Sequence, residues 1–219
     1  MFPAFALSDI IVDDSVVPAG KEIMLKAEVK GRLFSKGGEV VEFFVNGKSV
    51  GKSLSGGDGF AFKQIVPSRP GINHIKAKSG KDEGEGLLFS LKKGARIVLV
   101  DVQGSLIEKF SDKPKQRSQK VMKELNRKFP VVLLQAGLNA KSIKVWLKKN
   151  EFPEFPLIPL KQGAVFSDLH DNGFRIKAVI GSPDVISYAK DYKPLAFSFE
   201  ETEDAVEVKD WAEIEKKLK

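Results

Sequence analysis

The period of the hydrophobic pattern changes near Lys92-Lys93-Gly94, and this change limits the folds open to the chain. Before it, apolar and polar residues alternate in short runs separated by glycine-containing turns, as in Ile23–Val29. Alternation with period two is typical of strands with one buried face. After it, aliphatic runs alternate with segments of helical spacing. The sequence therefore predicts two domains, residues 1–93 and 94–219, the first all β and the second α/β.

The first domain contains a strong β-hairpin signal. Val41–Val45 leads into Asn46-Gly47, a pair that favours a tight two-residue turn, and Lys48-Ser49-Val50 returns from it. Further strands are expected over Gly59–Val66, Ile72–Lys78 and Leu87–Leu91. Short strands at regular spacing, with no helical stretch between them, predict an antiparallel sandwich of about seven strands.

Three segments of this domain resemble bacterial immunoglobulin-like domains. They are Val17-Pro18-Ala19-Gly20-Lys21, Phe44-Val45-Asn46-Gly47-Lys48, and Asp58-Gly59-Phe60-Ala61-Phe62 with the following Pro70–Ile75. The resemblance implies a spacer, a packing partner or a binding module. His74 alternates with apolar residues on a strand and is expected at the surface, so no residue here indicates catalysis.

In the second domain, strands and helices alternate along the chain. Strands are expected over Ile97–Val100, Val131–Leu134, Ile176–Gly181 and Leu195–Phe199. Helices are expected over Pro114–Phe129, Ala140–Lys149, Ala164–Asn172 and Val185–Asp191, with a last helix capped by Asp210. Such alternation predicts a doubly wound parallel sheet with helices on both faces.

One acidic residue is expected at the carboxyl end of a central strand. Ile97-Val98-Leu99-Val100 runs directly into Asp101, and Gly104 follows three positions later. Open α/β sheets place their ligands beyond the carboxyl ends of the strands. The stretch resembles the first motif of the haloacid dehalogenase (HAD)-like superfamily, in which an aliphatic strand precedes Asp-x-Asp-Gly-Thr-Leu. Asp101, Gly104 and Leu106 match this motif, whereas Gln103 stands in place of its second acid.

Three further stretches resemble parts of the same superfamily. Phe129–Gly137 falls where the second motif places a strand that ends in Ser or Thr. Trp146–Pro153 resembles a stretch of lipid-phosphatase-like members, the lipins among them, and Val179–Ala189 resembles the fourth motif. Lipins also combine an immunoglobulin-like part with a HAD-like part.

The resemblance implies roles for individual residues. Asp101 would be the nucleophile and, with Asp184, a ligand of Mg²⁺; Lys161 or Lys141 would hold the phosphate. Gln103 takes the place of the acid/base, and Gln135 takes the place of the phosphate-binding hydroxyl.

A glutamine cannot transfer a proton, and general acid–base catalysis is typically worth about 10²–10⁴-fold. Ser182 also stands where the fourth motif begins with an acid. We therefore expect a degenerate phosphatase site with a binding or scaffolding role. The alternative is a slow or unusual Mg²⁺-dependent phosphatase or phosphotransferase that uses Asp101 as nucleophile, so enzymatic activity stays open.

Two of these residues also have simpler explanations. The alternative for Asp101 is a carboxylate that caps nearby backbone N–H groups at the strand end. Ser182-Pro183-Asp184 is an ordinary start of a helix, with proline at an early position. His170 lies on an amphipathic helix and is expected at the surface.

Composition narrows the chemistry and the partners. The chain has no cysteine, which excludes disulfides, thiolate metal sites and cysteine nucleophiles. It has only two histidines, His74 and His170, so a multi-histidine metal centre is not expected. The net charge is +7, and its densest basic run, Lys109–Lys128, is expected to be a solvated helix face, with a patch for an anionic partner as the alternative.

Expected ligands are a phosphorylated small molecule or a lipid headgroup; a protein partner is left open, and nucleic acid is not expected. Met1–Leu7 lacks the basic start of a secretion signal, and no apolar run is long enough to span a bilayer. The sequence thus predicts a cytoplasmic protein.

Overall fold

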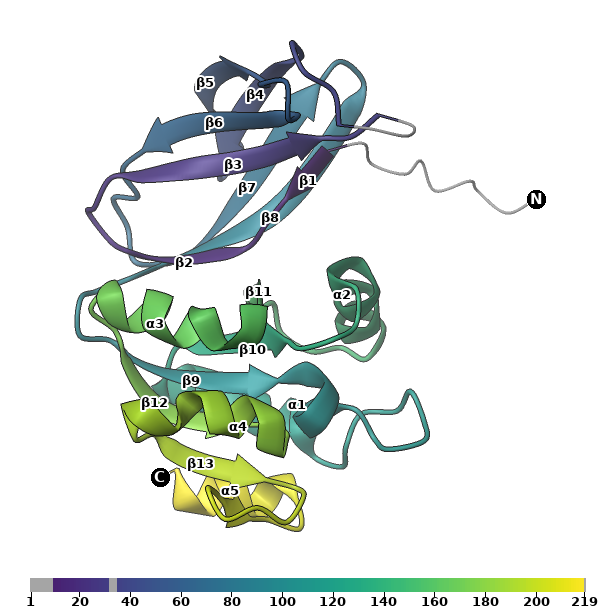
Figure 1. Cartoon of the computed structure of the whole chain (residues 1–219), viewed down its shortest axis with the longest axis vertical. Coiled ribbons are helices and arrows are strands. Elements are labelled where there is room, and N and C mark those ends of the chain that lie inside the picture. Colours follow the sequence, from purple (N-terminus) through teal and green to yellow (C-terminus); the bar gives the residue numbers. More distant parts are fainter. Residues whose placement is uncertain (1–9, 32–34, 219) are drawn as a thin grey trace. The chain divides into compact units, whose positions relative to one another are not determined.

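The computed structural model describes residues 10–31 and 35–218 (Figure 1). The chain divides into two compact units, Met1–Lys92 and Lys93–Lys219, one residue before the boundary expected from the change of period. The segment Met1–Leu7, on which the expectation about secretion rests, lies outside the described residues. Within those residues, no helix is both long and apolar enough to cross a membrane.

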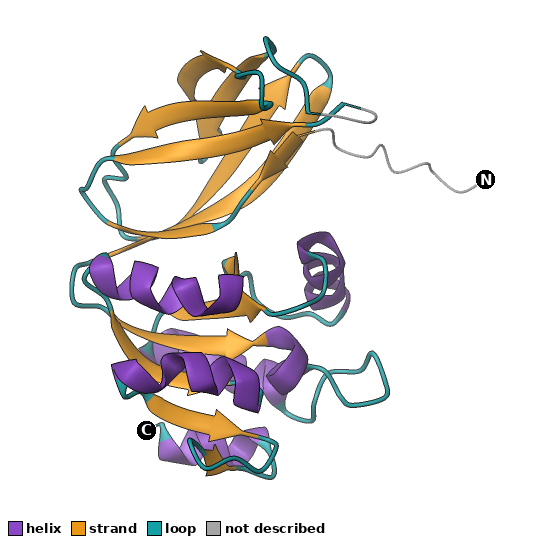
Figure 2. Cartoon of the chain, in the orientation of Figure 1, coloured by secondary structure: helices purple, strands orange, loops and turns teal. Residues whose placement is uncertain are grey.

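The N-terminal unit is a β-sandwich (Figure 2). One sheet has the order β1 (Ile10–Val12), β3 (Ile23–Val29), β6 (Phe60–Ile65). The other has the order β2 (Ser15–Pro18), β8 (Asp82–Leu91), β7 (Gly71–Ser79), β4 (Val40–Val45), β5 (Lys48–Leu54). Fully buried side chains between the sheets include Ala27, Phe43, Ala61, Ala77 and Leu88.

Two details of the sandwich bear on the sequence analysis. The predicted hairpin forms, with Asn46 and Gly47 both at positive φ, 50° and 78°. One strand pair departs from the expected antiparallel arrangement, since β2 runs parallel to β8. Only Asp13 and Asp14 separate β1 from β2, so the chain passes from one sheet to the other without turning back.

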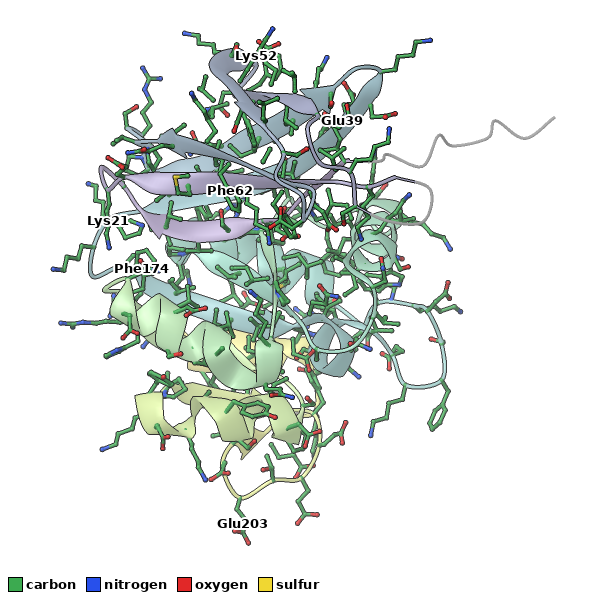
Figure 3. All side chains as sticks on the ribbon, turned by 45° about the horizontal axis from the view of Figure 1, so that its top comes forward. Lys21, Glu39, Lys52, Phe62, Phe174 and Glu203 are labelled. Atoms are coloured by element: carbon green, nitrogen blue, oxygen red, sulfur yellow. The ribbon has the colours of Figure 1, made fainter. Side chains whose placement is uncertain are left out.

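The close approach of β1 to β8 explains two glycines. A Cβ atom at Gly86 would lie 2.8 Å from the Val12 carbonyl oxygen, and one at Gly84 would collide with the carbonyl of Ile10. Only glycine leaves room for this contact between two backbones. The outer faces of the sheets carry longer side chains, such as Phe62, which is labelled in Figure 3 and is 44% exposed.

The C-terminal unit is built on a six-stranded sheet in which every pair is parallel. Its order is β11 (Leu157–Pro159), β10 (Val131–Gln135), β9 (Arg96–Asp101), β12 (Arg175–Ile180), β13 (Leu195–Ser198), β14 (Val206–Glu207). The parallel sheet expected from the sequence is therefore present, with two additional edge strands. Those two strands have three and two residues, too few to show a periodic pattern.

Helices cover both faces of this sheet (Figure 1). They are α1 (Ser118–Lys128), α2 (Ala140–Lys149), α3 (Ala164–Asp171), α4 (Pro183–Ala189) and α5 (Trp211–Lys217), with short 3₁₀ turns η2 (Lys161–Gly163) and η3 (Lys190–Tyr192). Apolar residues of α1, α2 and α5 form one core with alternate residues of the strands. Figure 1 shows α3 and α4 in front of the other face.

The helix expected from Pro114 begins only at Ser118. Pro114 instead pairs with Ile107 in an antiparallel bridge, and Arg117 adopts a left-handed φ of 67° directly before the helix. The segment between β9 and α1 therefore begins with a short π-helical turn, η1 (Val102–Leu106), and continues as a bridged loop. Asp210 caps α5 as predicted, accepting a hydrogen bond from the Glu213 amide at 3.0 Å.

Candidate functional site

Asp101 lies at the point where the strand order of the parallel sheet reverses. It is the last residue of β9, whose neighbours are β10 on one side and β12 on the other. The chain proceeds outward from β9 through β10 to β11, and then returns to β12 on the opposite side. Doubly wound sheets bind ligands in the crevice at this position, beyond the carboxyl ends of the strands. The candidate site is therefore centred on Asp101.

The carboxylate of Asp101 is 1% exposed and is engaged through both oxygens. Oδ1 accepts a hydrogen bond from the Gln103 amide at 3.1 Å, and Oδ2 accepts one from the Ser182 amide at 3.2 Å. Ser182 follows β12, so this one side chain joins the ends of the two central strands. Asp101 thus has the capping role that the sequence analysis gave as its simpler explanation.

Burial raises the pKa of the Asp101 carboxyl above its ordinary value. Desolvation is the largest cause, because the charged form loses its hydration in the interior. Hydrogen bonds from the backbone of Ser182, Gly104 and Gln103 act in the opposite direction, as does the hydroxyl of Ser182. The carboxyl is therefore more readily protonated than an exposed aspartic acid.

The π-helical turn after β9 is folded closely around this carboxylate. A Cβ atom at Gly104 would lie 2.6 Å from the Ser182 nitrogen and would also collide with Oδ2 of Asp101. The Ser105 hydroxyl donates a hydrogen bond to the Ile180 carbonyl at 2.8 Å, and the Trp211 indole donates one to the Ser105 carbonyl at 2.9 Å. Residue types at 104 and 105 are thus explained by the fold itself.

Gln103 is held by the loop that follows β10. Its side-chain oxygen, Oε1, accepts hydrogen bonds from the amides of Gly137 at 2.6 Å and Leu138 at 3.0 Å. Gln135, the last residue of β10, donates from Nε2 to the Leu138 carbonyl at 2.6 Å. The two glutamines therefore fix a single loop, and neither of them can donate or accept a proton as an acid or base would.

The remaining predicted site residues lie at the surface of the same unit. Asp184 is exposed in the first turn of α4, directly after Pro183 at the first helical position. Lys161 is exposed in η2, with φ of 47°, and Lys141 is exposed at the start of α2. The structure therefore places Asp101 beside the Gln103 backbone, and the side chains of Gln103 and Gln135 at one loop, whereas Asp184 and the two lysines are exposed.

These donors do not fit the magnesium ion that the HAD resemblance implies. Mg²⁺ binds oxygen ligands, carboxylates among them, and keeps several of its waters. Asp101 is 1% exposed and therefore closed to such a hydrated ion, and both of its oxygens already accept backbone N–H groups. Over residues 10–31 and 35–218, no group of three or more His, Asp or Glu side chains could hold a metal ion.

An apolar hollow of about 500 Å³ lies beside the site. Its lining includes Ile107 and Phe110 from the bridged loop, Leu138 from the loop held by Gln103, and Ile143 and Trp146 from α2. Sequence reasoning did not single out Phe110. The available signal was an isolated aromatic residue within a polar, lysine-rich segment.

Comparison with known proteins gives no family. No protein-family model and no curated protein matches the chain. Solved structures resemble about two fifths of the chain. A putative membrane-anchored protein from Corynebacterium diphtheriae matches 40% of it, with 20% identity and a TM-score of 0.35. The D0-D1 domain of intimin matches 42% of it, with 17% identity and a TM-score of 0.34. Domain I10 of titin follows with 37% coverage, 13% identity and a TM-score of 0.28.

The chain spans 22% of the Corynebacterium structure, 57% of the intimin structure and 98% of the titin domain. All three TM-scores lie below 0.5 and all three identities below 25%, so these resemblances assign no function. The sandwich architecture of the N-terminal unit rests on its own two sheets.

Proposed function

We propose that the C-terminal unit is a HAD-like domain whose phosphatase site has degenerated, and that the protein has a binding or scaffolding role. The motif Asp101-x-Gln103-Gly104-Ser105-Leu106 and the strand order around β9 support the relationship. The hydrogen bonds that Gln103 accepts from Gly137 and Leu138 support the loss of activity, because the residue at the acid/base position has a structural use.

The state of Asp101 supports the same proposal. A nucleophilic carboxylate must present an ionised oxygen to the phosphorus atom. Asp101 is buried, its pKa is raised, and each of its oxygens already accepts a backbone N–H. An attack on phosphate would require this buried carboxyl to be ionised and accessible to the phosphorus atom.

The test is turnover of p-nitrophenyl phosphate at millimolar Mg²⁺ by the wild type, Asp101→Asn and Gln103→Asp. We expect the wild type to hydrolyse no more substrate than Asp101→Asn, which reports any contaminating phosphatase. We expect Gln103→Asp to stay inactive as well, because a shorter, charged side chain there also disturbs the Gly137–Leu138 loop. Magnesium-dependent turnover by the wild type that disappears in Asp101→Asn would establish the alternative, an unusual phosphatase.

A further inference from the structure

The bridged loop between η1 and α1 presents an aromatic ring to solvent. Ile107 and Pro114 pair across its base, and the Glu108 amide donates to the Lys113 carbonyl at 2.9 Å. Phe110 lies at its tip with a left-handed φ of 68°, and its side chain is fully exposed. Figure 1 shows this loop extending away from the sheet, beyond the carboxyl ends of the strands. A bulky residue seldom adopts this conformation.

The loop is fixed to α2, so the two form one surface. The Trp146 indole donates a hydrogen bond to the Asp112 carbonyl, and Lys149 forms an ion pair with the Asp112 carboxylate at 3.5 Å. The apolar hollow lies between the loop and the helix. We call this surface the loop–α2 face; its exposed apolar residues are Phe110, Leu138 (44% exposed) and Val145 (61% exposed).

Exposed lysines stand beside Phe110 in the sequence and one helical turn from Val145 on α2. Val145 lies one helical turn from Lys141, Lys148 and Lys149, all of them exposed on α2. Phe110 follows Lys109 directly and precedes Lys113 by three residues. Among the described residues, Lys149 pairs with Asp112 and Lys109 pairs with Glu200 at 3.3 Å. The loop and α2 therefore both carry exposed apolar residues with lysines nearby in the sequence.

We propose that the loop–α2 face binds the surface of a membrane that contains anionic lipid, with Phe110 inserted at the boundary of headgroups and acyl chains. Apolar residues that enter this boundary and lysines that face anionic headgroups are the two parts of interfacial binding. Single-stranded nucleic acid fits less well, because it is bound by aromatic platforms, and Leu138 and Val145 offer aliphatic groups instead. The inference does not depend on whether the Asp101 site is active.

The experiment is co-sedimentation of the full chain with vesicles of phosphatidylcholine alone and with vesicles that also contain phosphatidylserine. We expect binding to the anionic vesicles only, weakened by added salt. Phe110→Ala should lower the partition coefficient by about tenfold, since burial of a phenylalanine ring is lost. The pair Lys141→Gln and Lys148→Gln should lower it by about fivefold per lysine.

Matched controls come from the N-terminal unit. Phe62→Ala removes another partly exposed ring, and Lys48→Gln with Lys81→Gln removes two exposed lysines elsewhere. Both controls should bind anionic vesicles as the wild type does. Since Phe110 makes no buried contact, its variant should keep the wild-type melting temperature, which separates loss of binding from loss of fold.

Three results would overturn the proposal. One is the absence of binding to phosphatidylserine vesicles at low salt. Another is vesicle binding that Phe110→Ala and the lysine pair leave unchanged, which would place the contact elsewhere on the chain. The third is Phe110-dependent binding of a single-stranded oligonucleotide with no binding of vesicles, which would assign the face to nucleic acid.

Discussion

The side-chain oxygen of Gln103 accepts a hydrogen bond from the backbone nitrogen of Gly137, 2.6 Å away and 34 residues further along the chain. The same oxygen also accepts a hydrogen bond from the backbone nitrogen of Leu138. A residue at the position where the HAD pattern has an acid therefore fastens the turn after β9 to the loop after β10. This use of Gln103 can be tested without any assay of activity.

Gln103→Ala should release the loop after β10. Gly137 and Leu138 are exposed, so in the variant their amides can form hydrogen bonds with water. We therefore expect the free energy of unfolding to fall by about 1 kcal/mol, the usual net contribution of a hydrogen bond. Hydrogen exchange of these two amides should become faster. Gln103→Glu, which keeps an oxygen at the same reach, should retain slow exchange; equal exchange rates in the wild type and the alanine variant would refute this role.

The raised pKa of Asp101 predicts a particular pH dependence of stability. In the unfolded chain the carboxyl titrates near its ordinary pKa, about 3.9, whereas in the folded protein it titrates higher. Between these two values the folded state binds more protons, so the contribution of Asp101 to stability is fully present at low pH and falls as pH rises through this window. Asp101→Asn has no such titration.

The measurement is thermal unfolding of the wild type and Asp101→Asn over a pH series from below 4 to neutral. The wild type should lose stability relative to the variant as pH rises, and the difference should level off above the folded-state pKa. A difference that is constant across the series would mean that the pKa of Asp101 is not raised.

Gly104→Ala should destabilise the C-terminal unit. Its Cβ atom would meet the Ser182 nitrogen and the Asp101 carboxylate, and both belong to a buried arrangement that has little room to move. Overpacking of this kind typically costs about 1–3 kcal/mol. Gly57→Ala, where no atom lies within 4 Å of the new methyl group, is the control and should unfold like the wild type.

Trp211→Phe should loosen the π-helical turn. The indole is fully buried, and its N–H donates to the Ser105 carbonyl. Phenylalanine preserves an aromatic ring but leaves that carbonyl without its donor, at a cost of about 1–3 kcal/mol. Urea unfolding followed by the fluorescence of Trp146, the remaining tryptophan, would measure the change. An unaltered midpoint would show that the bond contributes nothing.

Local patterns in the sequence predicted much of the fold. Asn46-Gly47 predicted its hairpin because the tight turn is determined by local residues that accept positive φ. Asp210 predicted the start of α5 because its side chain caps an amide only three residues away. The start of α1 was predicted too early, since Pro114 is used in a bridge to Ile107 that no local pattern reveals. Edge strands β11 and β14 are too short to carry a period.

The site was predictable only in part. Four aliphatic residues before Asp101 located it at a strand end, and the strand order placed that end at the centre of the sheet. The partners of its side chains lie far away in sequence. Ser182 is 81 residues from Asp101, and Leu138 is 35 residues from Gln103, distances over which residue types alone indicate no hydrogen bond.

The indole of Trp211 reaches a carbonyl that precedes it by 106 residues. As the chain emerges from a ribosome, Ser105 is therefore available long before its donor has been made. The turn around Asp101 gains the hydrogen bond from Trp211 only once α5, the fifth helix of the unit, packs against the sheet. A chain that lacks the last helix would therefore also lack the donor to the Ser105 carbonyl in the turn after β9.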